Sequence, residues 1–306
     1  MGASRETDST RHPGAAASRE MNRVTDSSGQ NDQGRLDKQH QRQRDIAEMV
    51  IAEGTVRLEE ISRRFGVSAM TIRRDLETLE AQSVLRRTRG HATALASSLF
   101  ESNTFFRQTQ SIESKKALAH AAMGFLEPGH TVMLDDSTTG IYLARLLPQR
   151  APLTVVTNFL SVANELLNEP FITLNLLGGQ YYSWCNATLG GITVDAIRML
   201  RVDILIMSAS AIIDYTCFHH SQETHLVKRA MFESAAQRIL YIDHTKFQRR
   251  ALIGLAPLSD FDAVIVDSLT PPEHVSRLRD SGTRVLVASS GAGKLGTNPD
   301  RSGDVT

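Results

Sequence analysis

The spacing of apolar residues predicts three short helices near the start of the chain. The first runs from about 37 to 53, with apolar residues on one face and a glycine after it, and the second runs from about 58 to 65. A turn over Gly66-Val67-Ser68 separates the second helix from the third. Ser68 is the expected N-cap of the third helix, because its hydroxyl can accept a hydrogen bond from an open backbone N–H.

The third helix divides into an apolar face and a polar face. At about 100° per residue, Ile72, Leu76 and Leu79 form one narrow apolar stripe. The opposite face and its edge hold Met70, Thr71, Arg73, Arg74, Glu77 and Thr78. A helix-turn-helix needs this division, because one face packs on the neighbouring helices and the other enters the major groove of DNA.

A short basic β-hairpin is expected directly after the third helix, over residues 84–95. From Arg63 to Arg89 the chain carries seven arginines against Asp75, Glu77 and Glu80, a net charge of +4 where DNA phosphates would lie. A small helical bundle with a solvated charged face would explain the arginines alone. The turn, the helix spacing and the hairpin together predict a DNA-binding winged helix over 37–95. Its candidate DNA contacts are Ser68, Met70, Thr71, Arg73, Arg74, Thr78, Arg86, Arg87 and Arg89.

From residue 113 onward, strand-like and helical patterns alternate. The strand-like runs are 131–135, 153–157, 172–177, 202–208, 238–243, 261–267 and 284–288. Helical patterns fall between most of them, at 115–126, 141–147, 160–167, 223–236 and 272–281. This alternation is typical of an α/β domain with a mostly parallel sheet covered by helices, here over 113–288.

The remaining segments are polar. Residues 1–36 and 289–306 are expected to be disordered, because they hold too few apolar residues to form a core, and 96–112 is expected to be a linker. Met21 is a second candidate start of the chain. The 34 basic residues balance 34 acidic ones, so no overall charge indicates a partner. Two cysteines, no secretory signal and no long apolar run indicate a cytoplasmic setting.

Polar residues gather where the strand-like runs end, which is the edge at which parallel sheets bind ligands. Asp135-Asp136-Ser137-Thr138-Thr139-Gly140 would offer hydroxyls, backbone N–H groups and the positive end of a helix dipole to an oxyanion such as phosphate. Simple N-capping by Ser137 or Thr138 explains the same residues equally well. The candidate effector contacts are Asp135, Ser137, Thr138, Thr139, Thr157, Asn158, Gly178, Gly179, Lys228, Asp243 and Lys246.

Metal and catalytic sites are not expected. The second half contains one cysteine and several histidines close together in sequence, but Cys217-x-His219 is a poor match to zinc-ligand spacing. No nucleophile motif such as Gly-x-Ser-x-Gly occurs. We therefore expect neither a metal nor a cofactor nor catalytic residues.

Several motifs, in order, resemble those of DeoR-family transcriptional regulators, from about Gln39 to Asp267. They are FGVSAMTIRRDLETLE, LRRTRGHA, MLDDSTTGIYLARLL, LTVVTN, LLGGQ, VKRAM and DHTKF. The resemblance implies a winged-helix DNA reader joined to a sensor domain similar to ribose-5-phosphate isomerase, which binds a phosphorylated sugar or sugar derivative. It also implies a homo-oligomer, a dimer or tetramer, that represses genes of carbohydrate metabolism.

Three stretches depart from the family pattern. Ser137 stands for the glycine of the usual Asp-x-Gly-Thr-Thr, and Phe159 for the serine of Thr-Asn-Ser. Residues 208–212 read Ser-Ala-Ser-Ala-Ile where many members carry Gly-Ala-x-Gly-Ile. The alternative to a regulator is a sugar-phosphate isomerase with a helical appendage. The similar isomerases carry an acidic cluster, Asp-Gly-Ala-Asp-Glu, near the strand that here reads Met-Ser-Ala-Ser-Ala, so we expect no catalysis.

Overall fold

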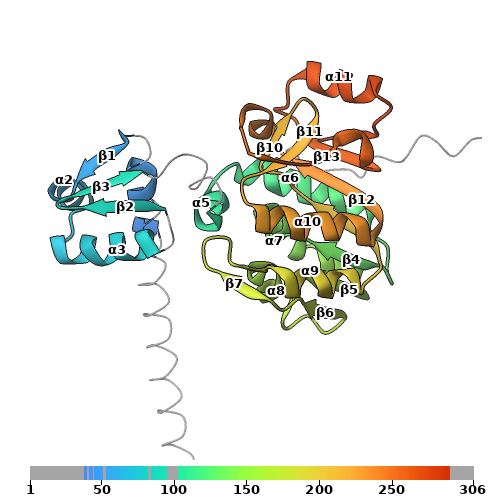
Figure 1. The fold of residues 1–306 in the computed structure, drawn as a ribbon, viewed down its shortest axis with the longest axis horizontal. Helices are drawn as coiled ribbons and strands as arrows, with labels where there is room; N and C mark the ends of the chain where they lie inside the picture. The colour runs from blue at the N-terminus through green and yellow to red at the C-terminus, as the bar shows by residue number, and fades with distance from the viewer. Residues whose placement is uncertain are drawn as a thin grey trace, which may run out of the picture. The chain divides into compact units, whose positions relative to one another are not determined.

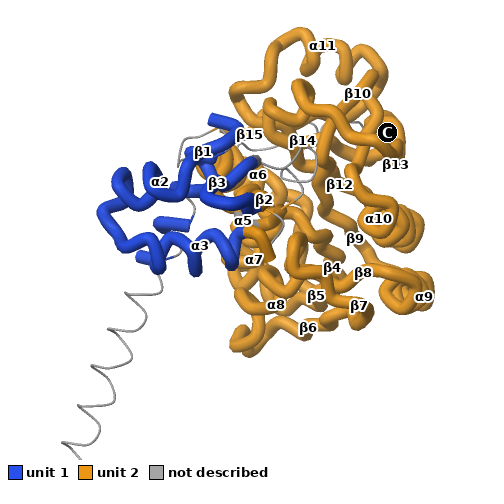
Figure 2. Tube along the Cα trace, turned by 60° about the vertical axis from the view of Figure 1, so that its left-hand side comes forward, with its two compact units in different colours: residues 1–79, 87–93 blue, residues 80–86, 94–306 orange. Residues whose placement is uncertain are grey.

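A computed structural model describes residues 38–39, 41–43, 45–50, 53–81, 84–94 and 103–289 of the chain. The chain divides into two compact units, residues 1–79 with 87–93 and residues 80–86 with 94–306 (Figure 2). The disorder expected at both ends falls outside the described residues, apart from Ser289. In the part of the chain that the structure describes, no helix is long and apolar enough to cross a membrane.

The N-terminal elements form a winged helix (Figure 1). Residues 38–39, 41–43 and 45–50 are helical, as expected for the first helix. The other elements are β1 (Thr55–Arg57), α2 (Leu58–Phe65), α3 (Ala69–Ala81), β2 (Leu85–Thr88) and β3 (His91–Ala94), with the sheet order β1-β3-β2. The hairpin is confirmed, whereas β1 was not predicted, because three residues are too few to show an alternating pattern.

The turn between α2 and α3 depends on Gly66. Gly66 has a φ of 63°, in the left-handed region, and its backbone N–H donates to the carbonyl of Ser62 at the end of α2. The predicted apolar stripe of α3, Ile72, Leu76 and Leu79, is fully buried. One stable orientation of α3 follows, with its arginine-bearing face directed away from the core.

The larger unit is built on seven parallel strands in the order β15-β14-β12-β9-β4-β5-β6. All seven coincide with predicted strand-like runs, so the expected α/β fold is confirmed. The strands are β4 (Thr131–Leu134), β5 (Leu153–Thr157), β6 (Ile172–Leu176), β9 (Val202–Met207), β12 (Ala235–Ile242), β14 (Ala263–Asp267) and β15 (Val285–Ala288).

Five smaller strands of this unit were not predicted. β7 (Gln180–Tyr182) and β8 (Ala187–Leu189) form a hairpin, while β10 (Ala211–Ile213), β11 (Thr216–His219) and β13 (Ile253–Pro257) form an antiparallel sheet. Most are three or four residues long, too short for a reliable pattern.

The helices of this unit largely follow the predicted pattern. They are α5 (Thr104–Thr109), α6 (Ile112–Ala122), α7 (Thr138–Ala144), α8 (Leu160–Leu166), α9 (Gly191–Arg198), α10 (Gln222–Ser234) and α11 (Pro272–Asp280), with short 3-10 turns η1 (Met123–Phe125), η2 (Leu147–Arg150), η3 (His244–Gln248) and η4 (Leu258–Asp260). α9 was not predicted, and α5 lies inside the segment expected to be a linker.

The helix predicted to end at residue 236 ends earlier, at Ser234. β12 begins at Ala235 and pairs there with Val202 of β9. Ala235 and Ala236 favour helix by propensity, but pairing with a central strand overrides that weak preference.

The strand order reverses between β4 and β9. The chain proceeds from β4 to β5 and β6 in one direction, and from β9 to β12, β14 and β15 in the other. Because crossovers between parallel strands are right-handed, α7 and α8 cover one face of the sheet and α10 covers the other (Figure 1). The carboxyl ends of β4 and β9 therefore flank a switch point, where open α/β sheets bind ligands.

Candidate DNA-binding surface and effector site

The polar face of α3 is directed to solvent. Met70 is 57% exposed, and both Arg73 and Arg74 are exposed, whereas Thr71 and Thr78 are half-buried. Ser68 accepts a 3.2 Å hydrogen bond from the backbone N–H of Thr71, as an N-cap does. The arginine pair thus stands on a rigid, capped helix.

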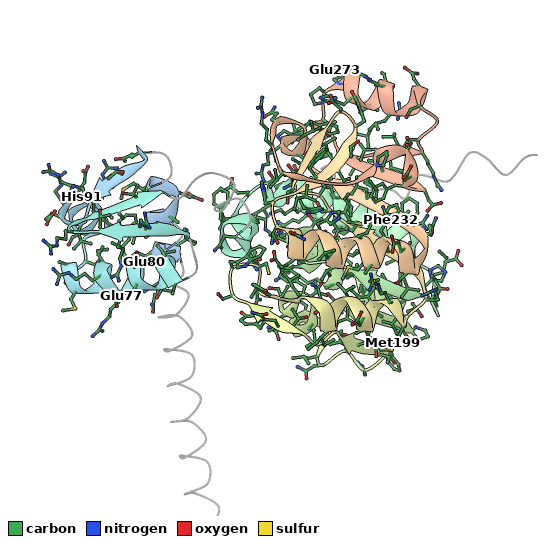
Figure 3. All side chains as sticks on the ribbon, in the orientation of Figure 1. Glu77, Glu80, His91, Met199, Phe232 and Glu273 are labelled. Carbon is green, nitrogen blue, oxygen red and sulfur yellow. The ribbon has the colours of Figure 1, made fainter. Side chains whose placement is uncertain are left out.

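The wing carries the other predicted arginines. Arg86 and Arg89 are exposed, and Arg87 donates to Glu77 of α3 at 3.0 Å, a residue labelled in Figure 3. The turn between β2 and β3 contains Gly90 with a φ of 77°. The Arg87–Glu77 contact links the wing to α3, so Arg87 has a structural contact in addition to its predicted one with DNA.

The structure corrects one assignment on α3. Asp75 is counted among the acids near the DNA, yet it is only 1% exposed. Its carboxylate accepts hydrogen bonds from Arg42 at 2.6 and 3.2 Å and from the amide of Gln43 at 3.0 Å. When Asp75 is left out of the count, the stretch from Arg63 to Arg89 has seven arginines and two glutamates, and its net charge is +5 rather than +4.

Two adjoining cavities open in the larger unit at the switch point, each of about 370 Å³ including the part open to solvent. Cavity A is bordered by residues after β4 and β9 and by residues from β11 and α10, among them Asp136, Ser210, His219, Thr224 and Lys228. Cavity B is bordered by Lys115, Thr138, Thr139, Asp243, Lys246 and Arg249. Arg107, Ser137 and Ser208 border both.

A buried ion cluster lies beneath the cavities. Lys228 is 4% exposed and bonds to the carboxylates of Asp135 and Asp136, the latter at 3.0 Å. Burial alone opposes its charged form, but the two carboxylates raise the pKa of Lys228 above its usual value. Asp135 also accepts from the backbone N–H groups of Ser137 and Ser208 at 3.1 and 2.9 Å. The cluster therefore holds β4, β9 and α10 together.

Ser137 has a local structural role. Its Oγ accepts from the backbone N–H of Gly140 at 3.3 Å, which caps α7, and lies 2.7 Å from the hydroxyl of the fully buried Tyr241. The N-capping expected as an alternative is therefore present. It coexists with a position at the wall of both cavities.

Cavity B has an excess of positive charge. Arg107, Lys115, Lys246 and Arg249 border it, against the single carboxylate of Asp243. Burial, together with Lys246, lowers the pKa of Lys115 to about 7, although Asp243 acts in the opposite direction. For Asp243, burial favours the neutral acid, but Lys246 and the hydrogen bond from Thr245 hold its pKa below the usual value. This arrangement favours an anionic group.

Five predicted effector contacts border neither cavity. Thr157 accepts from the backbone N–H of Phe159 at 3.1 Å, and Asn158 donates to the carbonyl of Thr188 at 2.8 Å. The carbonyl of Gly178 accepts from Thr193, whose hydroxyl would lie 2.0 Å from a Cβ added at Gly179. These contacts lie around the ends of β5 and β6, on the side of β4 away from the switch point. The fifth is Asp135, which is absent from the lining of either cavity.

Several lining residues were missed from the sequence. Ser208 and Ser210 follow a predicted strand and could have been found from that position. No sequence pattern indicated a role for Arg107, because the segment that contains α5 was predicted to be a linker. Lys115 resembled any lysine on a helix, and its burial follows only from packing.

The cysteines and histidines of this region form no metal site. Cys185 and Cys217 are buried thiols, and burial raises the pKa of Cys185 to about 12 and that of Cys217 further. Among the described residues, no group of three or more His, Cys, Asp or Glu side chains is placed to hold a metal ion.

Known proteins resemble both parts of the chain. Residues 42–98 match the DeoR-like helix-turn-helix domain, and residues 110–268 match the DeoR C terminal sensor domain. The glycerol-3-phosphate regulon repressor of Escherichia coli is 34% identical over 244 residues, covering 79% of this chain and 96% of that protein. The lactose phosphotransferase system repressor of Lactococcus lactis subsp. lactis is 29% identical over 233 residues, covering 75% of this chain and 91% of that protein.

Solved structures share the fold only distantly. A D-ribose-5-phosphate isomerase in complex with phospho-erythronic acid is 15% identical, covers 44% of this chain and 54% of its own, and gives a TM-score of 0.34. So remote a likeness supports no argument about activity. The two domain matches, and the repressors aligned over most of their length, show the family instead. The chain belongs to the DeoR family of DNA-binding transcriptional regulators.

Proposed function

We propose that the chain is a repressor of carbohydrate-metabolism genes whose affinity for DNA changes when a phosphorylated sugar or sugar derivative binds cavity B. The observation that carries this proposal is the group of four cationic side chains around Ser137, Thr138 and Thr139. A phosphate monoester carries close to two negative charges at neutral pH and many acceptor oxygens, so it suits this lining. The names of the two repressors, of the glycerol-3-phosphate regulon and of the lactose phosphotransferase system, support the same chemical class.

The DNA side of the proposal rests on α3 and the wing. Arg73, Arg74, Thr71 and Met70 would face base edges, with Ser68, Thr78, Arg86, Arg87 and Arg89 at or near the backbone. One winged helix with a local charge of about +5 binds DNA weakly, so a homo-oligomer with two copies on repeated half-sites is the working form. Because the related proteins are bacterial transcriptional repressors, the cytoplasm is the expected compartment.

Helix α5 provides a physical route from ligand to DNA-binding unit. It is the first described element after β3 in the chain, and its residue Arg107 borders both cavities. The carbonyl of Arg107 accepts hydrogen bonds from Lys115 and, at 3.3 Å, from Thr138, both of which border cavity B. A phosphate that draws these two donors toward itself would release that carbonyl and so alter how α5 is held.

The test uses the full-length chain with a DNA footprint on its own promoter region. Inorganic phosphate and a panel of three- to six-carbon sugar phosphates are titrated by calorimetry and by thermal shift, since a ligand of the folded state raises the melting temperature. Trp184 borders cavity A and is the chain's only tryptophan, so its fluorescence reports ligand binding as well.

Lys246→Met should weaken binding of the active phosphate about tenfold, because a charge-assisted hydrogen bond is lost. Lys116→Met is the matched control: Lys116 lies on α6 beside Lys115, is exposed and pairs with Glu113. It should leave the affinity unchanged. The proposal is wrong if no phosphate compound binds the wild-type chain or alters its footprint.

A further inference from the structure

Two residues that border cavity A each have a buried nitrogen without a hydrogen-bond partner among the described residues. His219, at the end of β11, is 2% exposed, and its Nδ1 lies 3.3 Å from Ser210 Oγ. Its Nε2 has no hydrogen-bond partner among the described residues, and neither has Nε of Arg107. Both side chains border cavity A. Leaving such an atom unsatisfied costs free energy, so a ligand in cavity A that hydrogen-bonds to either nitrogen would be stabilised by that contact.

The charges around cavity A differ from those around cavity B. Its two cationic side chains are Arg107 and Lys228, and Lys228 is already paired with Asp135 and Asp136. Arg107 itself lies 3.7 Å from Asp136 and donates to that residue's carbonyl at 3.2 Å. The lining is therefore close to neutral. Burial and the nearby Lys228 hold the pKa of His219 well below its usual value, so its ring is uncharged at pH 7.

We propose that cavity A is a second subsite, in which His219 Nε2 and Arg107 Nε hydrogen-bond an uncharged, hydroxyl-bearing part of the effector. The proposal rests on the proposed function, because the effector's phosphate is placed in cavity B. A hydroxyl can donate and accept, so it satisfies Nε2 in either tautomer of His219, and it also accepts from Arg107. The effector is then a monophosphate with a polyhydroxylated chain, since a second phosphate or a carboxylate would lack a counter-charge in cavity A.

The experiment compares ligands that carry the phosphate, the hydroxyl groups, or both. Calorimetry on the full-length chain measures ribitol 5-phosphate, sorbitol 6-phosphate, n-pentyl phosphate, inorganic phosphate and ribitol. At least one polyol phosphate should bind more tightly than n-pentyl phosphate and inorganic phosphate. His219→Phe keeps the ring but removes both nitrogens, and it should weaken the polyol phosphate about fivefold, the effect of one neutral hydrogen bond, with no change for the other two phosphates.

Two further variants test whether the loss of affinity is specific to the hydrogen bond of His219. His219→Gln places an amide near the position of Nε2 and should restore most of the affinity, while confirming that the pocket still folds. His225→Phe is the matched control: His225 lies on α10, has a buried Nδ1 without a partner among the described residues, and borders neither cavity. It should leave every affinity unchanged.

The inference is overturned if His219→Phe weakens all phosphates equally or none, or if n-pentyl phosphate binds as well as the polyol phosphates. In those outcomes phosphate still binds, and the proposed function stands without the second subsite. Binding of ribitol that depends on His219, without binding of any phosphate, would support cavity A and refute the phosphate role of cavity B. Failure of all five compounds would refute both.

Discussion

The contact between Arg42 and Asp75 leads to a quantitative prediction about the winged helix. Among the described residues, Arg42→Ala would leave the buried carboxylate of Asp75 with the amide of Gln43 as its one side-chain donor. Removing one partner of a buried ion pair costs about 3–5 kcal/mol, and the lower end applies because the Arg42 side chain is 21% exposed. A winged helix of this size has a total stability of about 3–8 kcal/mol, at roughly 0.05–0.15 kcal/mol per residue. A loss of about 3 kcal/mol would therefore leave a large fraction of it unfolded.

The assay separates the two units. Trp184 is the only tryptophan and lies in the larger unit, so its fluorescence follows that unit alone during unfolding in urea. Far-ultraviolet circular dichroism follows the helices of both units. In Arg42→Ala, circular dichroism should show an early transition that fluorescence lacks, and the amides of α3 should exchange faster with deuterium. Asp75→Asn should cost only about 1 kcal/mol, because the neutral amide still accepts a hydrogen bond.

Arg74→Ala serves as the control, since Arg74 is exposed on the opposite face of the same helix. It should leave both transitions unchanged. The reasoning fails if Arg42→Ala shifts the stability of the winged helix by no more than about 0.5 kcal/mol, the usual range of a surface substitution.

Four further outcomes follow from the structure. Arg74→Ala should weaken specific DNA binding by about 1–3 kcal/mol if Arg74 reads a guanine, as measured by mobility shift at fixed salt; unchanged affinity would exclude it from the reading residues. The pKa of Lys115 is lowered to about 7, so above pH 7 the binding of a phosphate should be accompanied by protonation of Lys115. Calorimetry in buffers of different ionisation enthalpy should detect this proton uptake, and Lys115→Met should abolish it. For the same reason the stability of the larger unit should rise between about pH 7 and 10.5, where the unfolded lysine still holds its proton. Gly179→Ala should destabilise the larger unit by about 2 kcal/mol or more, because the added Cβ would lie 2.0 Å from the hydroxyl of Thr193 and the φ of Gly179 is 147°. Gly178→Ala is the control, because a Cβ there has nothing within 4 Å. Equal urea midpoints for the two variants would contradict the prediction.

The five central strands of the sheet were predictable because they are largely buried and contain apolar runs. The buried Asp75 was harder to predict. At about 100° per residue it lies beside Leu79, at the edge of the apolar stripe, so its angle alone could not decide between core and surface. Its partner Arg42 lies 33 residues earlier in the chain. No local pattern reports a contact across that separation.

The lining of the two cavities was predictable only in part, for a related reason. Strand ends converge on one site only at the switch point, and its position depends on strand order, which the sequence does not display. The residues after β4 and β12 therefore border the cavities as expected, including Thr138, Asp243 and Lys246. Thr157 ends β5 and Asn158 follows it, beyond the switch point, and both hydrogen-bond to nearby backbone groups outside the two cavities.

Two of the departures from the DeoR pattern lie at the same place. Ser137 and Ser208 both stand where the family usually has glycine, and both border cavities A and B. With Arg107, they form the wall that the two cavities share. Each adds a side chain where glycine has none. Under the proposal above, an effector that spans both cavities meets these side chains, which favours an extended carbon chain over a sugar ring.

This position leads to a prediction about effector selectivity. Replacing both serines with glycine should raise the affinity for ring-forming sugar phosphates relative to open-chain polyol phosphates, as calorimetry would show. The loss of the Ser137 cap costs only a few tenths of a kcal/mol when glycine replaces it, although the bond to Tyr241 is also lost. An unchanged ratio of the two affinities in this variant would mean that the serines do not control selectivity. A changed ratio would place the specificity of this chain at the shared wall, with the phosphate bound on one side and the hydroxyls read by His219 on the other.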